Sequence, residues 1–289
     1  MLFQFHLKNN HKDFFMRSIA FLFLAFAAVQ MVAAEYKNIS YYEKNAPAQG
    51  NVEYRNQRCK LSLLTPDNKK GFPTLVVFHG GGLSRGEGKY PAYINRDNIA
   101  LVAVNYRLSG KGGACPDYIY DAAAAVAWVV KNIEKYGGDS KKVYVTGVSA
   151  GGYLTAMIAL DKKYLATFGV DTHAIAGYFP ITGQMSTHFR ILKERRDVNP
   201  STRDFAIDEY APLYHACKNA PNMMFFVGDP AYDMPARAEE NALIVARLTT
   251  IYGNKGIKLF SVPYGTHSNC VPPSLAAIDR LICPPQRKR

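Results

Sequence analysis

Short β-branched runs alternate with longer helical stretches along most of this 289-residue sequence, and the alternation limits the folds open to it. The runs at 73–80 and 99–108 are largely apolar, as is typical of strands buried on both faces of a sheet, and the β-branched run at 141–149 is the next expected strand. The stretch at 116–139 has the composition of a helix that ends at a glycine pair. The pattern predicts an α/β fold with a mostly parallel central sheet flanked by helices.

No internal repeat or low-complexity linker interrupts residues 35–289, which we therefore expect to form one catalytic domain. The same reasoning predicts further strands at 52–66, 173–181, 222–229 and 257–265, and helices from Gly152, at 235–253 and at 272–282.

The N-terminal region has the features of an export signal. An apolar run follows Arg17 and closes with small residues at Val32 and Ala34, as in a signal peptide cleaved before the next residue. We expect 1–34 to be a signal peptide, with Met16 as an alternative start, and the mature protein to be secreted or periplasmic. An uncleaved anchor is the other reading, although the apolar core is short for a span of about 20 residues.

The chain is basic, with a formal net charge of +12. Its lysines and arginines are scattered, and no basic motif interleaved with aromatic residues indicates nucleic-acid binding. We expect a solvated surface, no nucleic-acid partner, and at most a weak association with acidic polysaccharide or with an anionic envelope surface.

Five cysteines follow the predicted signal peptide, and export would permit disulfides. Their odd number leaves at least one thiol free or paired with another molecule. No Cys-x-x-Cys or Cys/His spacing indicates a metal site, and we expect no metal or organic cofactor.

The sequence VTGVSAGG at 145–152 requires a strand to turn into a helix with almost no loop. Glycines at 147 and 151 leave room for such a corner, which pushes Ser149 outward. A G-x-S-x-G string between a strand and a helix is typical of a nucleophile elbow. Ser149 is therefore the candidate nucleophile, and it needs a base to attack at neutral pH.

Three glycines follow His79 at the end of the buried run at 73–80. Glycines leave backbone N–H groups free to point at a developing negative charge. We therefore expect the N–H groups of Gly81, Gly82 and Ala150 to form an oxyanion hole. For His79 we expect a structural role in ordering the loop.

The base is expected after the last strand, where SVPYGTHSNC places His267 just beyond a glycine. His173, His188 and His215 compete with it. The first of these begins an earlier strand and the other two fall in a long loop region, where a surface or pocket-lining role is more common.

The acid that orients the imidazole is expected after the preceding strand, where Asp229 and Asp233 are both candidates. In the usual pattern the acid comes two or three residues past the last glycine of the strand. Here that position is occupied by Pro230 or Ala231, so the loop departs from the pattern. The sequence slightly favours Asp229 and leaves both open. The one that is not the acid is expected to cap the helix near 235, whose Glu239 and Glu240 read as surface charges.

With the order serine, aspartate, histidine along the chain, the sequence resembles the α/β-hydrolase fold family. Within it, the chain is similar to esterases that carry HGGG and G-x-S-A-G-G, which include hormone-sensitive-lipase-like carboxylesterases and small bacterial feruloyl or acetyl esterases. The likeness covers nearly all of residues 50–280. Two departures are Val148, where the lipase-like branch usually has aspartate, and the displaced acid.

The resemblance implies a serine carboxylesterase that hydrolyses short or aromatic acyl esters of a small molecule or an oligosaccharide, and the signal-like N-terminus adds export; we expect the ester to be one of a carbohydrate. Only one sizeable insertion, 183–214, is expected to form short helices over the site, so any cap is small or missing. Its His188, Phe189 and Arg190 would touch the sugar side of a carbohydrate ester.

Two other functions fit the same residues. A serine peptidase similar to prolyl oligopeptidases would share the elbow and the triad, but those enzymes generally carry a large second domain. A non-catalytic, ligand-binding member of the fold would usually lack a triad residue, and function lies in the site rather than in the fold. Cleavage of an aminoacyl-proline amide would identify the peptidase.

Overall fold

The computed structural model of the chain describes residues 33–43, 46, 49–67, 69–195 and 205–284. The predicted signal peptide at 1–34 lies almost wholly outside these residues. The chain has all of the elements named below within residues 32–289. None of its described helices is both long enough and apolar enough to cross a membrane.

Eight strands form one sheet in the order β1-β2-β4-β3-β5-β6-β7-β8. Strand β2 is antiparallel to both of its neighbours, and the other pairs are parallel. The mostly parallel sheet predicted from the sequence is therefore confirmed. The strands are β1 (Glu35–Ser40), β2 (Lys60–Leu64), β3 (Phe72–Phe78), β4 (Ala100–Val104), β5 (Gly138–Val148), β6 (Gly177–Ile181), β7 (Met223–Val227) and β8 (Ile257–Ser261).

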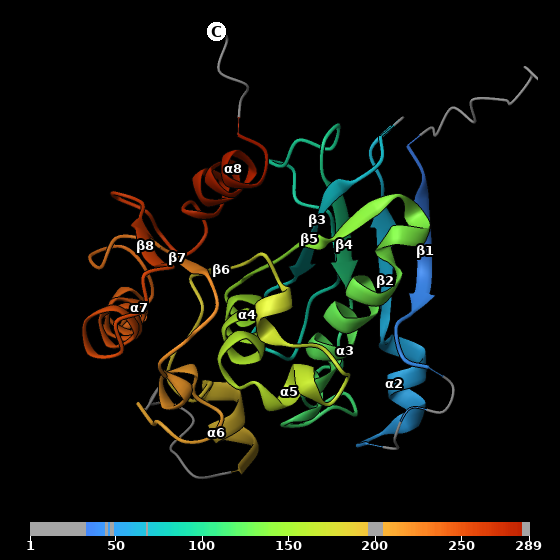
Figure 1. Cartoon of the computed structure of the whole chain (residues 1–289). Helices are drawn as coiled ribbons and strands as arrows, with labels where there is room; N and C mark the ends of the chain where they lie inside the picture. The colour runs from blue at the N-terminus through green and yellow to red at the C-terminus, as the bar shows by residue number, and fades with distance from the viewer. Residues whose placement is uncertain (1–32, 44–45, 47–48, 68, 196–204, 285–289) are drawn as a thin grey trace, which may run out of the picture. The chain divides into compact units, whose positions relative to one another are not determined.

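Helices connect the strands and cover the sheet (Figure 1). The α-helices are α2 (Val52–Arg58), α3 (Asp117–Asn132), α4 (Ala150–Leu160), α5 (Lys163–Ala166), α6 (Phe189–Arg195), α7 (Arg237–Ala246) and α8 (Val271–Ile282). Shorter turns are η1 (Ile133–Tyr136), η2 (Thr172–Ala174), η3 (Pro212–His215) and the π-helical η4 (Arg247–Ile251).

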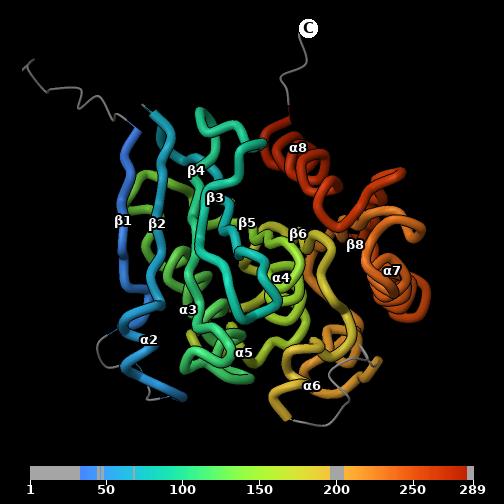
Figure 2. The backbone as a smooth tube through the Cα atoms, turned by 180° about the vertical axis from the view of Figure 1, so that it is seen from behind, coloured from blue at the N-terminus to red at the C-terminus, as the bar shows by residue number. Residues whose placement is uncertain are grey.

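The core lies on both faces of the sheet because side chains alternate along each strand. In β3, Val76 and Phe78 belong to a cluster that includes α3, α4 and α7. Their neighbours Leu75 and Val77 belong to a second cluster, which includes α8. Figure 2, which views the sheet from behind, agrees with Figure 1 that α3, α4 and α5 lie on one side of β3, β4 and β5.

The expected strand at 52–66 is wrong in its first half, because residues Val52–Arg58 form helix α2. The side chain of Asn51 accepts a hydrogen bond from the backbone N–H of Tyr54 and caps the helix. Glu53 in the first turn and Arg58 in the last turn interact favourably with the helix dipole and stabilise the helix. Local capping therefore outweighed the alternating pattern, and the strand begins only at β2.

Parallel strands bring the loops at their carboxyl ends to one edge of the sheet. At this edge β3 and β5 are in register, with Phe78 opposite Gly147, and β7 and β8 are in register, with Val227 opposite Ser261. The segments that directly follow these four strands carry Ser149, His267, both candidate aspartates and the expected oxyanion-hole residues.

Candidate active site

Ser149 stands at the corner between β5 and α4, with φ 56° and ψ −113°. This is a strained conformation for a residue with a side chain. The backbone N–H of Ser149 donates to the carbonyl oxygen of Ile181, and its carbonyl oxygen accepts from the N–H of Tyr153 at 2.9 Å. The structure therefore holds the serine in the geometry of a nucleophile elbow.

The corner depends on two glycines, because a side chain at either position would clash with the backbone. A Cβ atom on Gly151 would lie 2.2 Å from the carbonyl oxygen of Phe78, and one on Gly147 would lie 2.5 Å from the backbone of Gly151. Both clashes involve backbone atoms that cannot rotate away. The glycines are thus required by the close approach of α4 to β3 and β5.

The loop after β3 turns sharply, with φ 108° at Gly81 and φ 60° at Gly82. Among the described residues, the N–H groups of these two glycines have no hydrogen-bond acceptor. Ala150 is the first residue of α4, where N–H groups have no partner within the helix. The three donors predicted for the oxyanion hole are therefore available, beside a helix N-terminus that favours negative charge.

His79 orders this loop, as the sequence indicated. Its Nδ1 donates to the carbonyl oxygen of Gly80 at 2.7 Å, and its ring stacks on Tyr106 with centroids 4.2 Å apart. The hydroxyl of Tyr106 donates to the His79 carbonyl oxygen at 2.8 Å. Burial lowers the pKa of His79 to about 4, so the ring is neutral at physiological pH.

His267 follows β8 and lies against Asp233. The Nδ1 of His267 donates to Oδ1 of Asp233 at 3.0 Å, and the aspartate side chain is fully buried while the histidine side chain is 24% exposed. Burial alone would raise the pKa of Asp233, but hydrogen bonds from His267, Met234 and Gly228 hold that pKa below its ordinary value. Asp233 therefore remains ionised and orients the imidazole.

The structure places Asp229, which the sequence slightly favoured as the acid, against backbone N–H groups and not against His267. Its carboxylate accepts hydrogen bonds from the backbone N–H groups of Ala231 at 3.0 Å and Tyr264 at 3.0 Å. These bonds lower its pKa and link the loop after β7 to the loop after β8. The expectation that one of the two aspartates caps the helix near 235 is wrong, because α7 has no side-chain cap and begins after Ala236, which lies in the left-handed region.

One cavity of about 740 Å³ is lined by candidate catalytic residues from loops that lie far apart in the sequence. Ser149, His267, Gly81 and Gly82 all line it. The remaining lining residues are Gly80, Ser84, Arg85, Val148, Phe189, Arg190, Met234, Arg237, Ser268, Val271 and Pro272.

The insertion at 183–214 contributes α6 to this cavity through Phe189 and Arg190. His188 is buried, its ring stacks on Phe189 with centroids 4.5 Å apart, and its Nδ1 accepts from the N–H of Arg190 at 3.1 Å. Burial, and then the charges of Arg237 and Arg190, hold the pKa of His188 well below its ordinary value. His188 is thus a neutral ring behind the cavity wall.

Glu240 was expected at the surface, and this expectation is wrong. Its side chain is buried, and its carboxylate accepts from the N–H groups of Met185 at 2.7 Å and Ser186 at 3.1 Å and from the hydroxyl of Ser186 at 2.9 Å. Glu240 therefore anchors the start of the insertion to α7. Nothing in the local sequence distinguishes it from its exposed neighbour Glu239.

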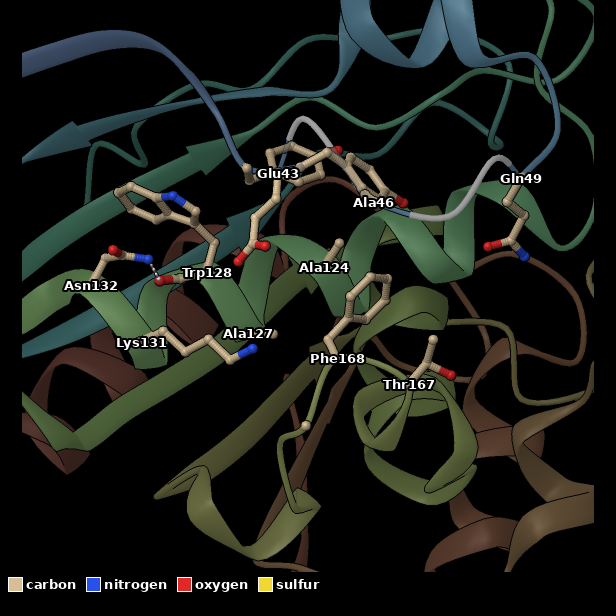
Figure 3. A pocket seen from close by; sticks show the side chains of 13 residues that line it. Glu43, Ala46, Gln49, Ala124, Ala127, Trp128, Lys131, Asn132, Thr167 and Phe168 are labelled. Carbon is tan, nitrogen blue, oxygen red and sulfur yellow. Dashed lines mark hydrogen bonds between the residues drawn. The ribbon is translucent and has the colours of Figure 1, made fainter.

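A second cavity, of about 390 Å³, lies between α3 and the segments around Tyr42 and Phe168. Figure 3 shows Glu43, Lys131 and Phe168 pointing toward the same space, beside Trp128. The described residues that line it include no serine, cysteine or histidine. Among these lining residues no serine stands beside a histidine, so the candidate active site is the first cavity.

All five cysteines are free thiols in the structure. Cys270 is the one beside the site, where its Sγ donates to the carbonyl oxygen of His267 at 3.7 Å. Burial raises its pKa to about 12, so it stays protonated. Within the described residues, no group of three or more His, Cys, Asp or Glu side chains could hold a metal ion.

Several known proteins resemble this chain over part or most of its length. A family model described as BD-FAE matches residues 61–194. A relative from Oryza sativa subsp. japonica named "Probable isoprenylcysteine alpha-carbonyl methylesterase ICMEL1" is 27% identical over 228 residues, which are 70% of this chain and 53% of the relative. The chain thus spans about half the length of this relative, and 22% to 23% of two other curated relatives.

Two solved structures share the arrangement of elements. The hyperthermophilic esterase from Pyrobaculum calidifontis has a TM-score of 0.65 at 20% identity, covering 93% of this chain and 90% of that one. A truncated carbohydrate esterase from gut microbiota has a TM-score of 0.64 at 18% identity, covering 88% and 97%. The matches confirm that the chain has the α/β-hydrolase fold and is similar to carboxylesterases.

Proposed function

We propose that this α/β-hydrolase fold chain is a serine carboxylesterase in which Ser149, His267 and Asp233 form the catalytic triad. The observation that carries the proposal is the 3.0 Å hydrogen bond from His267 Nδ1 to the buried Asp233 carboxylate, at a cavity that Ser149 also lines. A histidine whose Nδ1 donates to a carboxylate presents Nε2 as the atom that accepts a proton.

In the proposed reaction, Ser149 Oγ attacks the carbonyl carbon of the ester while its proton passes to Nε2 of His267. The oxyanion of the tetrahedral intermediate accepts hydrogen bonds from the N–H groups of Gly81, Gly82 and Ala150. His267 returns the proton to the leaving alcohol as the C–O bond breaks. A water molecule, deprotonated by the same imidazole, then releases the acid and restores the serine.

The proposed substrates are esters of short or aromatic acids, with a small molecule or a carbohydrate as the alcohol. Apolar side chains of Val148 and Val271 line the cavity and would pack against the acyl group. In the part of the insertion that the structure describes, α6 lines the cavity through Phe189 and Arg190, which would contact the alcohol side of the ester. Export to the cell exterior or periplasm is part of the same proposal and is motivated by the signal-like sequence at 1–34.

The test is hydrolysis of 4-nitrophenyl acetate, butyrate and decanoate by wild type and by Ser149→Ala. We expect the wild type to prefer the short esters, and the variant to lose at least about 10⁴-fold in kcat, as for the loss of a triad nucleophile. Ser140→Ala is the matched control, since Ser140 lies at the opposite end of β5 from Ser149.

Acetylated and feruloylated oligosaccharides would follow as substrates, with an aminoacyl-proline amide as the comparison. Activity that survives in Ser149→Ala would refute the nucleophile. A strong preference for the amide would replace the esterase with a peptidase, and a preference for decanoate would argue against a carbohydrate ester.

A further inference from the structure

The loop after β3 is rich in glycine, although it carries two of the proposed oxyanion-hole donors. Residues 79–88, which we call the oxyanion loop, have glycine at positions 80, 81, 82, 86 and 88. Glycine has more backbone freedom than any other residue, so a segment of this composition does not keep one conformation by itself. The N–H groups of Gly81 and Gly82 can therefore stabilise an oxyanion only if contacts from outside the loop fix their direction.

One such contact comes from Arg58, the last residue of α2. Its Nε donates to the carbonyl oxygen of Tyr106 at 3.1 Å, and its Nη2 donates to the carbonyl oxygen of Gly86. Gly86 belongs to the oxyanion loop, whereas Tyr106 follows β4. A single side chain from α2 thus links the oxyanion loop to the segment after β4.

Both residues that Arg58 binds also contact His79. The ring of Tyr106 stacks on the imidazole with centroids 4.2 Å apart, and its hydroxyl donates to the His79 carbonyl oxygen at 2.8 Å. Gly86 lies so close that a Cβ atom there would be 2.5 Å from Nδ1 of His79 and 2.6 Å from the carbonyl oxygen of Gly80. A shift of either residue would therefore move His79 and, through its 2.7 Å bond to Gly80, the start of the glycine run.

Other contacts hold the oxyanion loop at different positions. The N–H of Gly88 donates to Oδ1 of Asn105 at 2.9 Å, and Arg190 donates to the carbonyl oxygen of Gly82 at 3.4 Å. Among the described residues, no second side chain donates to the loop carbonyl oxygen that Arg58 binds. The bond from Arg58 therefore has no substitute at its own position.

We propose that Arg58 is a positioning residue for the oxyanion hole: by binding the carbonyl groups of Gly86 and Tyr106, it fixes His79 and keeps the glycine N–H groups directed at the reacting carbonyl. Arginine suits this role because its planar guanidinium presents several N–H donors in fixed directions, whereas the ammonium of lysine is a point charge on a flexible stem. The inference rests on the proposed esterase and adds to it a residue that does not line the cavity.

The first test compares kcat and KM for 4-nitrophenyl acetate. Arg58→Gln should lower kcat by about tenfold or more and change KM by less than about twofold, because the oxyanion exists in the transition state and not in the bound ester. Arg58→Lys keeps the charge at the end of α2 and should lose nearly as much. Lys89→Gln is the matched control, since it removes an equal charge from an exposed position directly after the oxyanion loop.

A pair of ketones tests the oxyanion hole directly. Ser149 Oγ adds to the carbonyl carbon of butyl trifluoromethyl ketone, the π electrons of the carbonyl become a lone pair of the oxyanion, and the serine proton passes to His267. Butyl methyl ketone has a similar shape but does not favour this addition. Arg58→Gln should raise the Ki of the fluorinated ketone by the factor by which kcat/KM falls and change the Ki of the methyl ketone by less than about twofold. An equal change for both ketones would overturn the inference.

Failure of this inference is separable from failure of the esterase. All rates are expressed per folded molecule, with the folded fraction taken from circular dichroism, so a loss of stability does not count as a loss of kcat. Hydrolysis that disappears in Ser149→Ala but keeps its wild-type kcat in either Arg58 variant would overturn the positioning role and leave the esterase intact. Activity that persists in Ser149→Ala would refute the esterase. If Arg58→Gln does not fold, Arg58→Lys provides the same comparison.

Discussion

Replacing Asp233 by asparagine removes the negative charge behind His267 while keeping the size of the side chain. In the wild type, Oδ1 accepts from Nδ1 of the imidazole at 3.0 Å inside a fully buried side chain, so water cannot replace the bond. The amide that replaces it can donate to Nδ1 and stabilise the tautomer that carries its proton on Nε2. That tautomer cannot take the proton of Ser149.

We therefore expect kcat of Asp233→Asn on 4-nitrophenyl acetate to fall by about 10⁴, which corresponds to about 5 kcal/mol of transition-state stabilisation. Asp229→Asn is the matched control, because Asp229 bonds only to backbone N–H groups among the described residues. It should keep at least about a third of the wild-type kcat, in line with the small effect of most surface substitutions.

Melting curves of both variants would separate a loss of folding from a loss of catalysis. The assignment of the acid would be wrong if Asp229→Asn lost more activity than Asp233→Asn. It would also be wrong if folded Asp233→Asn kept more than about a tenth of the wild-type kcat.

Two further predictions concern stability. Gly151→Ala places a Cβ atom 2.2 Å from the carbonyl oxygen of Phe78 and should lower the free energy of unfolding by about 3 kcal/mol or more. Gly253→Ala, at φ 70° with open space around it, should lower the free energy of unfolding by only about 1 kcal/mol. Urea titrations measure both values, and equal losses would contradict the packing argument. Because the pKa of Asp233 lies below its ordinary value in the folded chain, its contribution to stability is present at neutral pH and disappears as pH falls below about 4. The difference in free energy of unfolding between wild type and Asp233→Asn should therefore be constant from about pH 7 to pH 5 and narrow as pH falls below about 4, and a difference that stays constant there would count against the bond.

The elbow could be predicted from the sequence because its geometry is set by neighbours in the chain. Only glycines at 147 and 151 allow α4 to begin directly at the end of β5, and that requirement can be recognised in a short string of residues. The loop after β3 was predictable for the same reason. His267 required one more premise, the order of strands in the fold, which the alternating pattern supplied.

The choice between Asp229 and Asp233 could not be made from the sequence. Both follow β7 within a few residues, and their side chains diverge because Asp229 accepts from Tyr264 in the loop after β8 whereas Asp233 turns inward to His267. The choice depends on how two loops separated by 34 residues pack against each other. Helix α2 was missed because capping by Asn51 is compatible with an alternating pattern in the residues that follow.

The sequence by itself determined the mostly parallel sheet, the glycine corners and the candidate nucleophile, since each follows from residues adjacent in the chain. The tertiary structure alone decided which aspartate meets the imidazole, that Glu240 is buried, and that arginines from three separate segments line one cavity. The physical reason is that burial and electrostatic environment arise where distant segments meet, and no local pattern encodes which charges will share the same space.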